Sequence, residues 1–149
     1  MLQSTDEKSS VAKLLVPALT LAFFSTWIIE SITGVFLKDL TITFFGSSDP
    51  VSIATASQLV TLSSVVSVVF GVLLGVLSVR FSHKKLLFLG VLGVTLGTLG
   101  CFLAPDFLFM QIFYPVEGIG TVAVGAMVFA LVGEYLTLSK RGNATGWIT

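Results

Sequence analysis

The stretch Gly75-Val76-Leu77-Ser78-Val79-Arg80-Phe81-Ser82-His83-Lys84-Lys85 decides the fold, because its basic residues interrupt two long apolar runs. These runs cover Val51–Leu77 and Leu86–Ala104. A helix that crosses the hydrocarbon core of a bilayer needs about 20 predominantly apolar residues, and each run is about that long. We therefore expect the basic segment to be a short loop between two membrane-spanning helices.

The composition is that of a membrane protein. Hydrophobic residues make up 54% of the chain and charged residues 11%, and the mean hydropathy is +1.01, whereas a soluble domain averages about 25% charged residues. Nothing in the charge distribution supports nucleic-acid binding. The single cysteine, Cys101, cannot form an internal disulfide, and with one histidine it cannot make a metal site of the usual spacing. We expect no metal and no cofactor.

Four apolar segments predict an all-α integral membrane protein with about four transmembrane helices. Residues 1–13 are expected to be an amino-terminal tail, and residues 14–149 the transmembrane part, ending in the start of a fifth helix at Gly146-Trp147-Ile148-Thr149. The first segment is too long for the apolar region of a signal peptide, so we expect it to be retained. The four segments are Leu14–Leu37, Val51–Leu77, Leu86–Ala104 and Phe107–Leu136.

The basic residues predict the orientation. Seven of the eight Lys and Arg residues lie in the amino-terminal tail, in the second link or after the fourth segment. These three regions share one side of the membrane, and cytoplasmic loops carry an excess of Lys and Arg. We therefore expect a multi-pass protein of the cell membrane with a cytoplasmic amino terminus.

Small residues recur on one face of the second span and of the third. In lipid, helix contacts favour small residues because they let two backbones approach closely. A solute pathway is the alternative, but glycine offers a solute no side chain, so we expect helix packing here, including at the Gly71 and Gly75 pair. The positions are Ser57, Thr61, Ser64, Gly71, Gly75 and Ser78 on the second span, and Gly90, Gly93, Gly97 and Gly100 on the third.

Two prolines affect the predicted start and shape of the fourth span. Pro105 is expected to start this helix, whereas Pro115 lies inside it and removes one backbone hydrogen bond. A kink near Pro115 is expected. It indicates either a nearby cavity or a purely structural bend.

Two glutamates lie at membrane depth and are candidates for a substrate or proton pathway. Glu117 is ten residues into the fourth span, about 15 Å from its outer end, and Tyr114 and Thr121 share its face. Glu30 lies in the first span, where a structural pair or an interfacial position is the alternative. Ionisable residues inside a membrane usually face the bundle interior and mark ion or substrate paths.

The segment between the second and third spans resembles the signature of the major facilitator superfamily of secondary transporters, Gly-x-Leu-Ala-Asp-Arg-x-Gly-Arg-Lys-x-x-Leu. In the family the acidic residue is understood to help latch the two halves of the protein, and Val79 replaces it here. Ser82 also departs from the pattern, and Ser78 and His83 are near substitutes. The residues that match in register are Gly75, Leu77, Arg80, Lys84 and Leu87.

Two further stretches resemble the same family. Glu117-Gly118-Ile119-Gly120 is similar to its fourth-helix pattern Arg-x-x-Gln-Gly-x-Gly, with Tyr114 in place of the arginine and Glu117 in place of the glutamine. The stretch Arg141-Gly142-Asn143-Ala144-Thr145-Gly146 is similar to the start of the family's fifth helix.

The resemblance implies alternating-access transport of a small solute, with or without a coupled proton, by a protein of about twelve helices in two halves. The chain would then be a fragment or a truncated member. The alternative is a complete four-helix membrane protein that acts as a scaffold, an assembly subunit or an oligomeric transporter. Catalytic groups and a phosphate-binding loop are not evident in the sequence, so we do not expect an enzyme. The expected partners are the lipid bilayer and an unidentified solute.

Overall fold

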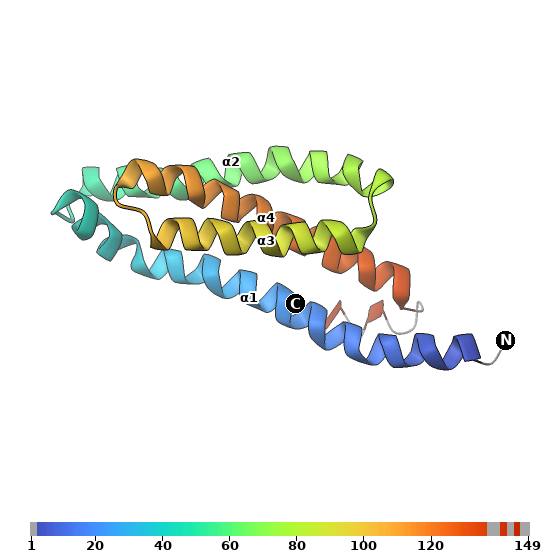
Figure 1. The fold of residues 1–149 in the computed structure, drawn as a ribbon. Coiled ribbons are helices and arrows are strands. Elements are labelled where there is room, and N and C mark those ends of the chain that lie inside the picture. The colour runs from blue at the N-terminus through green and yellow to red at the C-terminus, as the bar shows by residue number, and fades with distance from the viewer. Residues whose placement is uncertain (1–2, 137–140, 143–144, 147–149) are drawn as a thin grey trace.

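The computed structural model describes residues 3–136, 141–142 and 145–146, and the side chains from residue 15 onward. It contains four long helices: α1 (Gln3–Phe45), α2 (Pro50–Arg80), α3 (His83–Phe102) and α4 (Phe107–Tyr135) (Figure 1). By length and composition, all four can cross a membrane. The prediction of an all-α membrane protein is confirmed.

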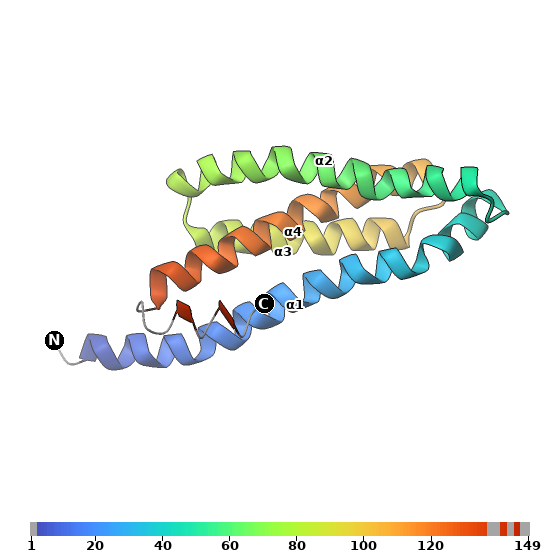
Figure 2. The same ribbon diagram turned by 180° about the vertical axis from the view of Figure 1, so that it is seen from behind.

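Consecutive helices run in opposite directions, and α4 is the central one. Figure 1 and Figure 2 show the α1–α2 and α3–α4 links together at one end, and the α2–α3 link at the other, nearer the amino terminus. We call the second end the basic end, because Arg80, Lys84 and Lys85 lie there. α4 contacts each of the other three helices and is the most buried of the four. It therefore determines how the rest of the bundle is arranged.

Helix α1 is longer than the sequence predicted at both ends. It begins at Gln3, so most of the expected tail of residues 1–13 is helical, and it passes Leu37 and ends at Phe45. Lys38 and Asp39 are polar but compatible with a helix. The stop comes at Gly46, whose φ of 69° is a left-handed conformation that favours glycine.

The basic residues lie at helix ends rather than in a loop, which corrects the prediction. Only Phe81 and Ser82 separate α2 from α3, and both have extended backbone conformations. Arg80 is the last residue of α2, where a positive charge interacts favourably with the helix dipole. Lys84 and Lys85 lie in the first turn of α3. Hydropathy places a basic cluster at a membrane boundary but does not say where the helix ends.

Helix α4 begins one residue beyond Asp106. The Asp106 carboxylate accepts a hydrogen bond from the Phe109 backbone N–H at 2.7 Å, which makes Asp106 the N-cap. Pro105 precedes this cap, so the expectation that it starts the helix is wrong. α4 stays helical through Pro115, and the kink there remains a prediction.

The expected fifth helix falls partly outside the described residues. Arg141, Gly142, Thr145 and Gly146 are helical. Residues 147–149, which carry the rest of that prediction, lie outside the described part of the chain.

Two apolar clusters pack along α4, one toward each end. The cluster at the basic end joins Leu19 of α1 to Val124, Val128 and Leu131 of α4. The other joins Leu59 of α2 to Met110 and Tyr114 of α4. The segment of α4 between these clusters contains Glu117.

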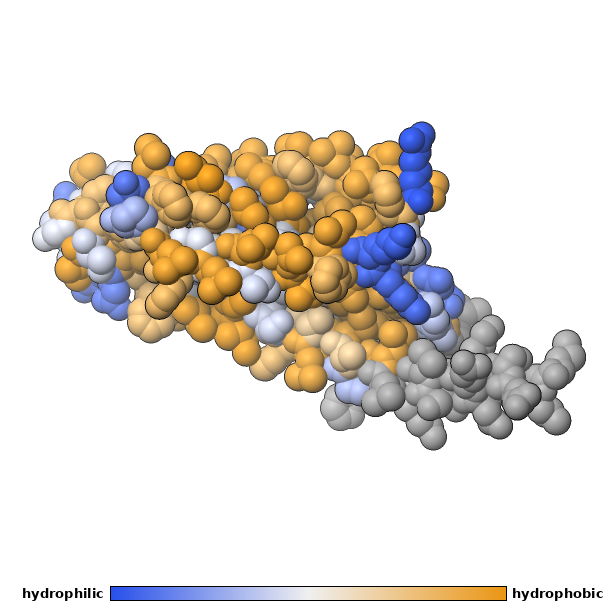
Figure 3. All heavy atoms as spheres, in the orientation of Figure 1, coloured by the Kyte–Doolittle hydropathy of each residue, from blue (hydrophilic) through white to orange (hydrophobic). Residues whose placement is uncertain are grey.

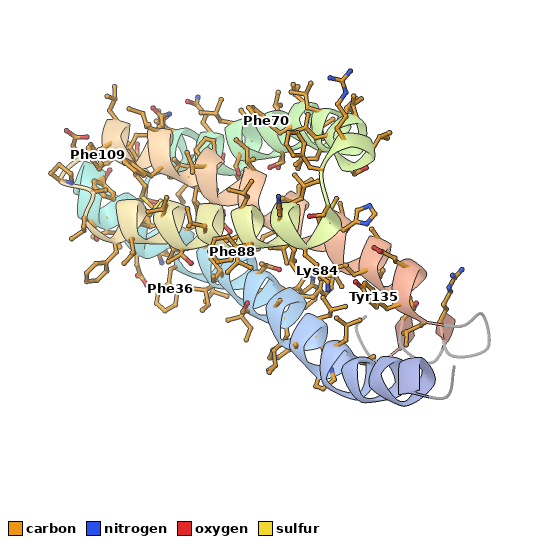
Figure 4. The ribbon with its side chains drawn as sticks, turned by 45° about the vertical axis from the view of Figure 1, so that its right-hand side comes forward. Phe36, Phe70, Lys84, Phe88, Phe109 and Tyr135 are labelled. Carbon is orange, nitrogen blue, oxygen red and sulfur yellow. The ribbon has the colours of Figure 1, made fainter. Side chains whose placement is uncertain are left out.

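The face of the molecule seen in Figure 3 is hydrophobic between two more hydrophilic ends. Each helix has an exposed phenylalanine, and these residues are labelled in Figure 4. Such a surface is suited to contact with lipid tails. The four phenylalanines are Phe36, Phe70, Phe88 and Phe109.

Candidate functional site

The glycines of α3 bring that helix against the backbone of α4. A Cβ atom added at Gly97 would collide with the backbone of Glu117, and one at Gly100 would collide with the ring of Phe113. A Cβ at Gly90 would lie 3.0 Å from Ala123 and Val124 and 3.2 Å from the Gly120 carbonyl oxygen, and one at Gly93 would lie 3.4 Å from the Gly120 Cα. We call these four α3 glycines, together with Gly120, the glycine seam. Along the seam the backbones of α3 and α4 lie in close contact, including at Glu117.

Two glycines of the Glu117-Gly118-Ile119-Gly120 stretch face different neighbours. A Cβ at Gly118 would collide with the hydroxyl groups of Ser63 and Ser67 on α2, whereas one at Gly120 would collide with the backbone of α3 at Val94. Residues two positions apart point to nearly opposite sides of a helix. These glycines therefore let α4 fit between α2 and α3.

The packing face of α2 differs from the predicted stripe. A Cβ at Gly71 would lie 3.2 Å from a methyl group of Val122, so Gly71 faces α4. At Gly75 no described atom lies within 4 Å of a Cβ built there, so its expected helix contact is not made within the described residues and stays a prediction. Thr61 and Ser64 are also exposed. The buried residues are Ala56, Leu59, Ser63 and Ser67, one helix row away from the predicted stripe.

A cavity of about 270 Å³ lies between α1, α2 and α4, and we call it the central cavity. It brings together all four residues that the sequence nominated for a substrate or proton pathway, namely Glu30, Tyr114, Glu117 and Thr121. They come from two helices that are far apart in the sequence. The remaining lining residues are Val60, Ser63, Ser64, Ser67, Gly118 and Val122.

Glu117 is the buried acid of this cavity, with 4% of its surface exposed. Its Oε1 accepts a hydrogen bond from the Thr121 hydroxyl at 2.8 Å. Among the residues whose side chains the structure describes, one ion pair is found, between His83 and Glu134. Glu117 therefore has no cationic partner among these residues. Burying an unpaired carboxylate is costly, so Glu117 is an energetically expensive feature of the bundle.

Glu30 is exposed, although it lines the same cavity from α1. It stands in the middle of a helix that is apolar enough to span a membrane. A carboxylate at such a position is disfavoured against lipid. Glu30 therefore requires water or further protein on that side.

A second cavity, of about 320 Å³, borders Glu117 and Tyr114 from the α3 side. Its walls are mostly apolar, with the hydroxyls of Thr33 and Thr98 and the thiol of Cys101 as polar groups. Glu117 and Tyr114 line both cavities. This buried part of α4 therefore borders a cavity on two sides.

The family-signature residues lie outside the central cavity, toward the basic end. Arg80 ends α2, and Gly75 and Leu77 are exposed near it. The Lys84 ammonium lies 5.0 Å from the centre of the Tyr135 ring (Figure 4). Next to it, His83 Nδ1 and Glu134 Oε2 are 3.0 Å apart. These contacts join the start of α3 to the end of α4.

Arg141 also binds the end of α4. Its Nε donates a hydrogen bond to the Leu136 carbonyl at 2.9 Å, and its guanidinium also donates to the Gly133 carbonyl. Gly133 lies in the last turn of α4 and Leu136 is its C-cap, a region where backbone carbonyls have no helical partner.

Sequence reasoning missed Ser63 and Ser67. Both are buried, both line the central cavity, and the Ser63 hydroxyl donates to the Tyr114 carbonyl at 3.5 Å. Their spacing of four residues, continued by Gly71, was a signal for a second row of small residues on α2. Across the described residues, no group of three or more His, Cys, Asp or Glu side chains comes together as a metal site.

Comparison with known proteins identifies the family. A family model described as Major Facilitator Superfamily matches residues 15–149. Searches of curated proteins and of solved structures gave no significant match. The match covers most of the chain, and the four membrane-length helices agree with it. The chain belongs to the major facilitator superfamily of membrane transporters.

Proposed function

We propose that this protein moves a small solute across a membrane by alternating access and that the central cavity is part of the solute path. The observation that carries the proposal is Glu117, a buried carboxylate that lines a cavity and has no cationic partner among the described residues. Intramembrane ionisable residues mark ion and substrate paths. A purely structural acid would be expected to have a paired cation.

The packing around α4 supports a moving bundle. α3 and α4 are joined by the glycine seam, whereas the central cavity separates α4 from parts of α1 and α2. Alternating access in secondary transporters is largely the movement of one rigid bundle against another around a fixed site. The α3–α4 pair is a suitable rigid element for such a movement.

Exposed Glu30 supports a larger assembly around these four helices. We propose that further helices complete the solute path on the α1 side, as in the architecture of about twelve helices in two halves that the family resemblance implies. The mass of the native gene product on a denaturing gel tests this directly. A native product of four helices that transports a solute by itself would contradict it.

We propose that Glu117 also carries the coupled proton. The other titratable groups lining the two cavities are Glu30, Tyr114 and Cys101. Glu117→Gln keeps the size of the side chain and its hydrogen bonding but removes the titration. In proteoliposomes with a pH gradient, this variant should lose solute accumulation and retain solute exchange at saturating solute concentrations, where weaker binding does not limit the exchange.

Glu134→Gln is the matched control, because Glu134 is on the same helix but lies beside His83 outside the cavity. It should accumulate solute normally. Full accumulation by Glu117→Gln would exclude Glu117 as the coupling group and leave Glu30 as the next candidate.

We propose further that the basic end is cytoplasmic, because most Lys and Arg residues of the sequence belong to the regions assigned to that side. Ser82 lies in the α2–α3 link and Ser48 in the α1–α2 link at the opposite end. In a Cys101→Ala background, cysteine at Ser48 should react with an impermeant thiol reagent on intact cells, and cysteine at Ser82 should be protected. The reverse labelling pattern would invert the topology.

A further inference from the structure

We propose that the solute is an organic cation with an ammonium group and a small apolar body, bound in the central cavity with its charge against Glu117. The inference rests on the proposed transport function and adds the chemical class of the solute. It follows from the charges, the hydrogen-bonding groups and the apolar surfaces of the cavity wall.

The charges of the wall have one sign. Its titratable residues include two carboxylates, Glu30 and Glu117, and its ten lining residues contain no Lys, Arg or His. An anionic solute would be repelled by both carboxylates. A cation would supply the partner that Glu117 lacks among the described residues and would offset the cost of burying it.

Glu117 is also held ready to accept a ligand. Thr121 donates to Oε1, and no described residue donates to Oε2. The backbone behind the side chain is fixed by its contact with Gly97. One carboxylate oxygen is thus held in position and the other is free to accept a hydrogen bond, and a preorganised group binds a ligand at lower entropic cost.

The rest of the wall fits an organic cation better than a bare metal ion. The hydroxyls of Ser63, Ser64 and Ser67 can accept hydrogen bonds from ammonium N–H groups, and Val60 and Val122 provide apolar surface for the body of the solute. Ca²⁺ instead takes six or more oxygen ligands, and Mg²⁺ keeps several waters in an octahedral shell.

Three probes of matched shape test the inference: phenylethylammonium, phenylethanol and phenylacetate, which differ in the charge of the head group. Binding is measured by calorimetry on the purified protein, with empty detergent micelles subtracted. We expect the cation to bind most tightly. Loss of a hydrogen bond to a charged group weakens binding by about tenfold or more, and we expect this loss for phenylethylammonium in Glu117→Gln.

Glu117→Asp retains the charge and should retain a preference for the cation, and Glu134→Gln should bind like the native protein. Size-exclusion chromatography and thermal unfolding establish that each variant is folded. If Glu117→Gln does not fold, Glu30→Gln replaces it, since Glu30 is exposed and lines the same cavity. Weaker cation binding in that variant supports the inference, and unchanged binding contradicts it.

The two proposals fail in different ways. Tighter binding of the alcohol or the acid, lost in Glu117→Gln, would overturn the cation preference and leave the cavity as the solute site. If a probe binds equally well to the native protein, to Glu117→Gln and to Glu30→Gln, the central cavity is not the solute site. The cation inference then fails as well. If the native protein binds none of the three probes, the inference of an organic cation of this size is wrong.

Discussion

The two sides of α4 form unlike contacts with their neighbours. Toward α3 the helices meet backbone to backbone along the glycine seam, and added Cβ atoms would overlap main-chain atoms at Gly97 and Gly120. Toward α1 and α2 the helix presents Tyr114, Glu117 and Thr121 to a cavity of about 270 Å³. One helix therefore combines a close-packed side with a polar, open side.

The difference shows how a membrane helix can hold a costly carboxylate in a defined position. Glycine gives a helix no side-chain contacts and lowers its propensity, so its value lies in the close approach that it allows. That approach fixes the backbone at Glu117 from behind. The polar side can then remain open without loss of order.

The largest expected effect comes from breaking the close-packed side. In Gly120→Leu the new side chain meets the backbone of α3 at Val94 and Gly90, which cannot rotate away. We expect a destabilisation above about 3 kcal/mol, the upper end of the usual range for overpacking. The yield of monodisperse protein in detergent and its thermal unfolding measure this effect.

Gly75→Leu is the control for this variant, because nothing described lies within 4 Å of a Cβ at that position. It should change stability by no more than about 0.5 kcal/mol. Equal losses in the two variants would mean that any leucine in place of a helical glycine is harmful, and the glycine seam would lose its special role.

A smaller effect is expected on the polar side. In Gly118→Ala the new methyl group meets the hydroxyls of Ser63 and Ser67, which are side-chain atoms and can rotate. We expect a destabilisation of about 1–2 kcal/mol by thermal unfolding. Ser63→Ala in the same chain removes one of the colliding oxygens and should restore part of the loss. If the destabilisations caused by Gly118→Ala and Ser63→Ala simply add, the new methyl group does not collide with the Ser63 hydroxyl.

The helices were predictable because apolar length is a local property. The four apolar segments correspond to four helices in the structure. The predicted helix ends were wrong where the backbone conformation, and not hydropathy, decides where the helix stops. Gly46, with its positive φ, ends α1 well beyond the end predicted at Leu37. Arg80 remains inside α2, although its charge had suggested a loop. Hydropathy measures where a helix leaves the membrane, which differs from where the helix ends.

The candidate site was predictable where its residues share one helix. Tyr114, Glu117 and Thr121 follow helical spacing, so their common face could be read from the sequence. Ser63 and Ser67 were missed because α2 carries two neighbouring rows of small residues, and only packing against Gly118 decides which row is buried. That choice depends on α4, which no local pattern of α2 contains.

The smallest expected effect concerns the ion pair that joins α3 to α4 at the basic end. His83 Nδ1 and Glu134 Oε2 are 3.0 Å apart, but the two side chains are 31% and 52% exposed. Exposed pairs contribute little, because water screens the charges and two side chains lose rotamer freedom. A double-mutant cycle of His83→Ala and Glu134→Gln, followed by thermal unfolding, should give a coupling energy below about 1 kcal/mol. A value in this range would show that the ion pair adds little to the contact between α3 and α4. A coupling above about 2 kcal/mol, outside the range for exposed pairs, would show instead that the basic end is held mainly by charge.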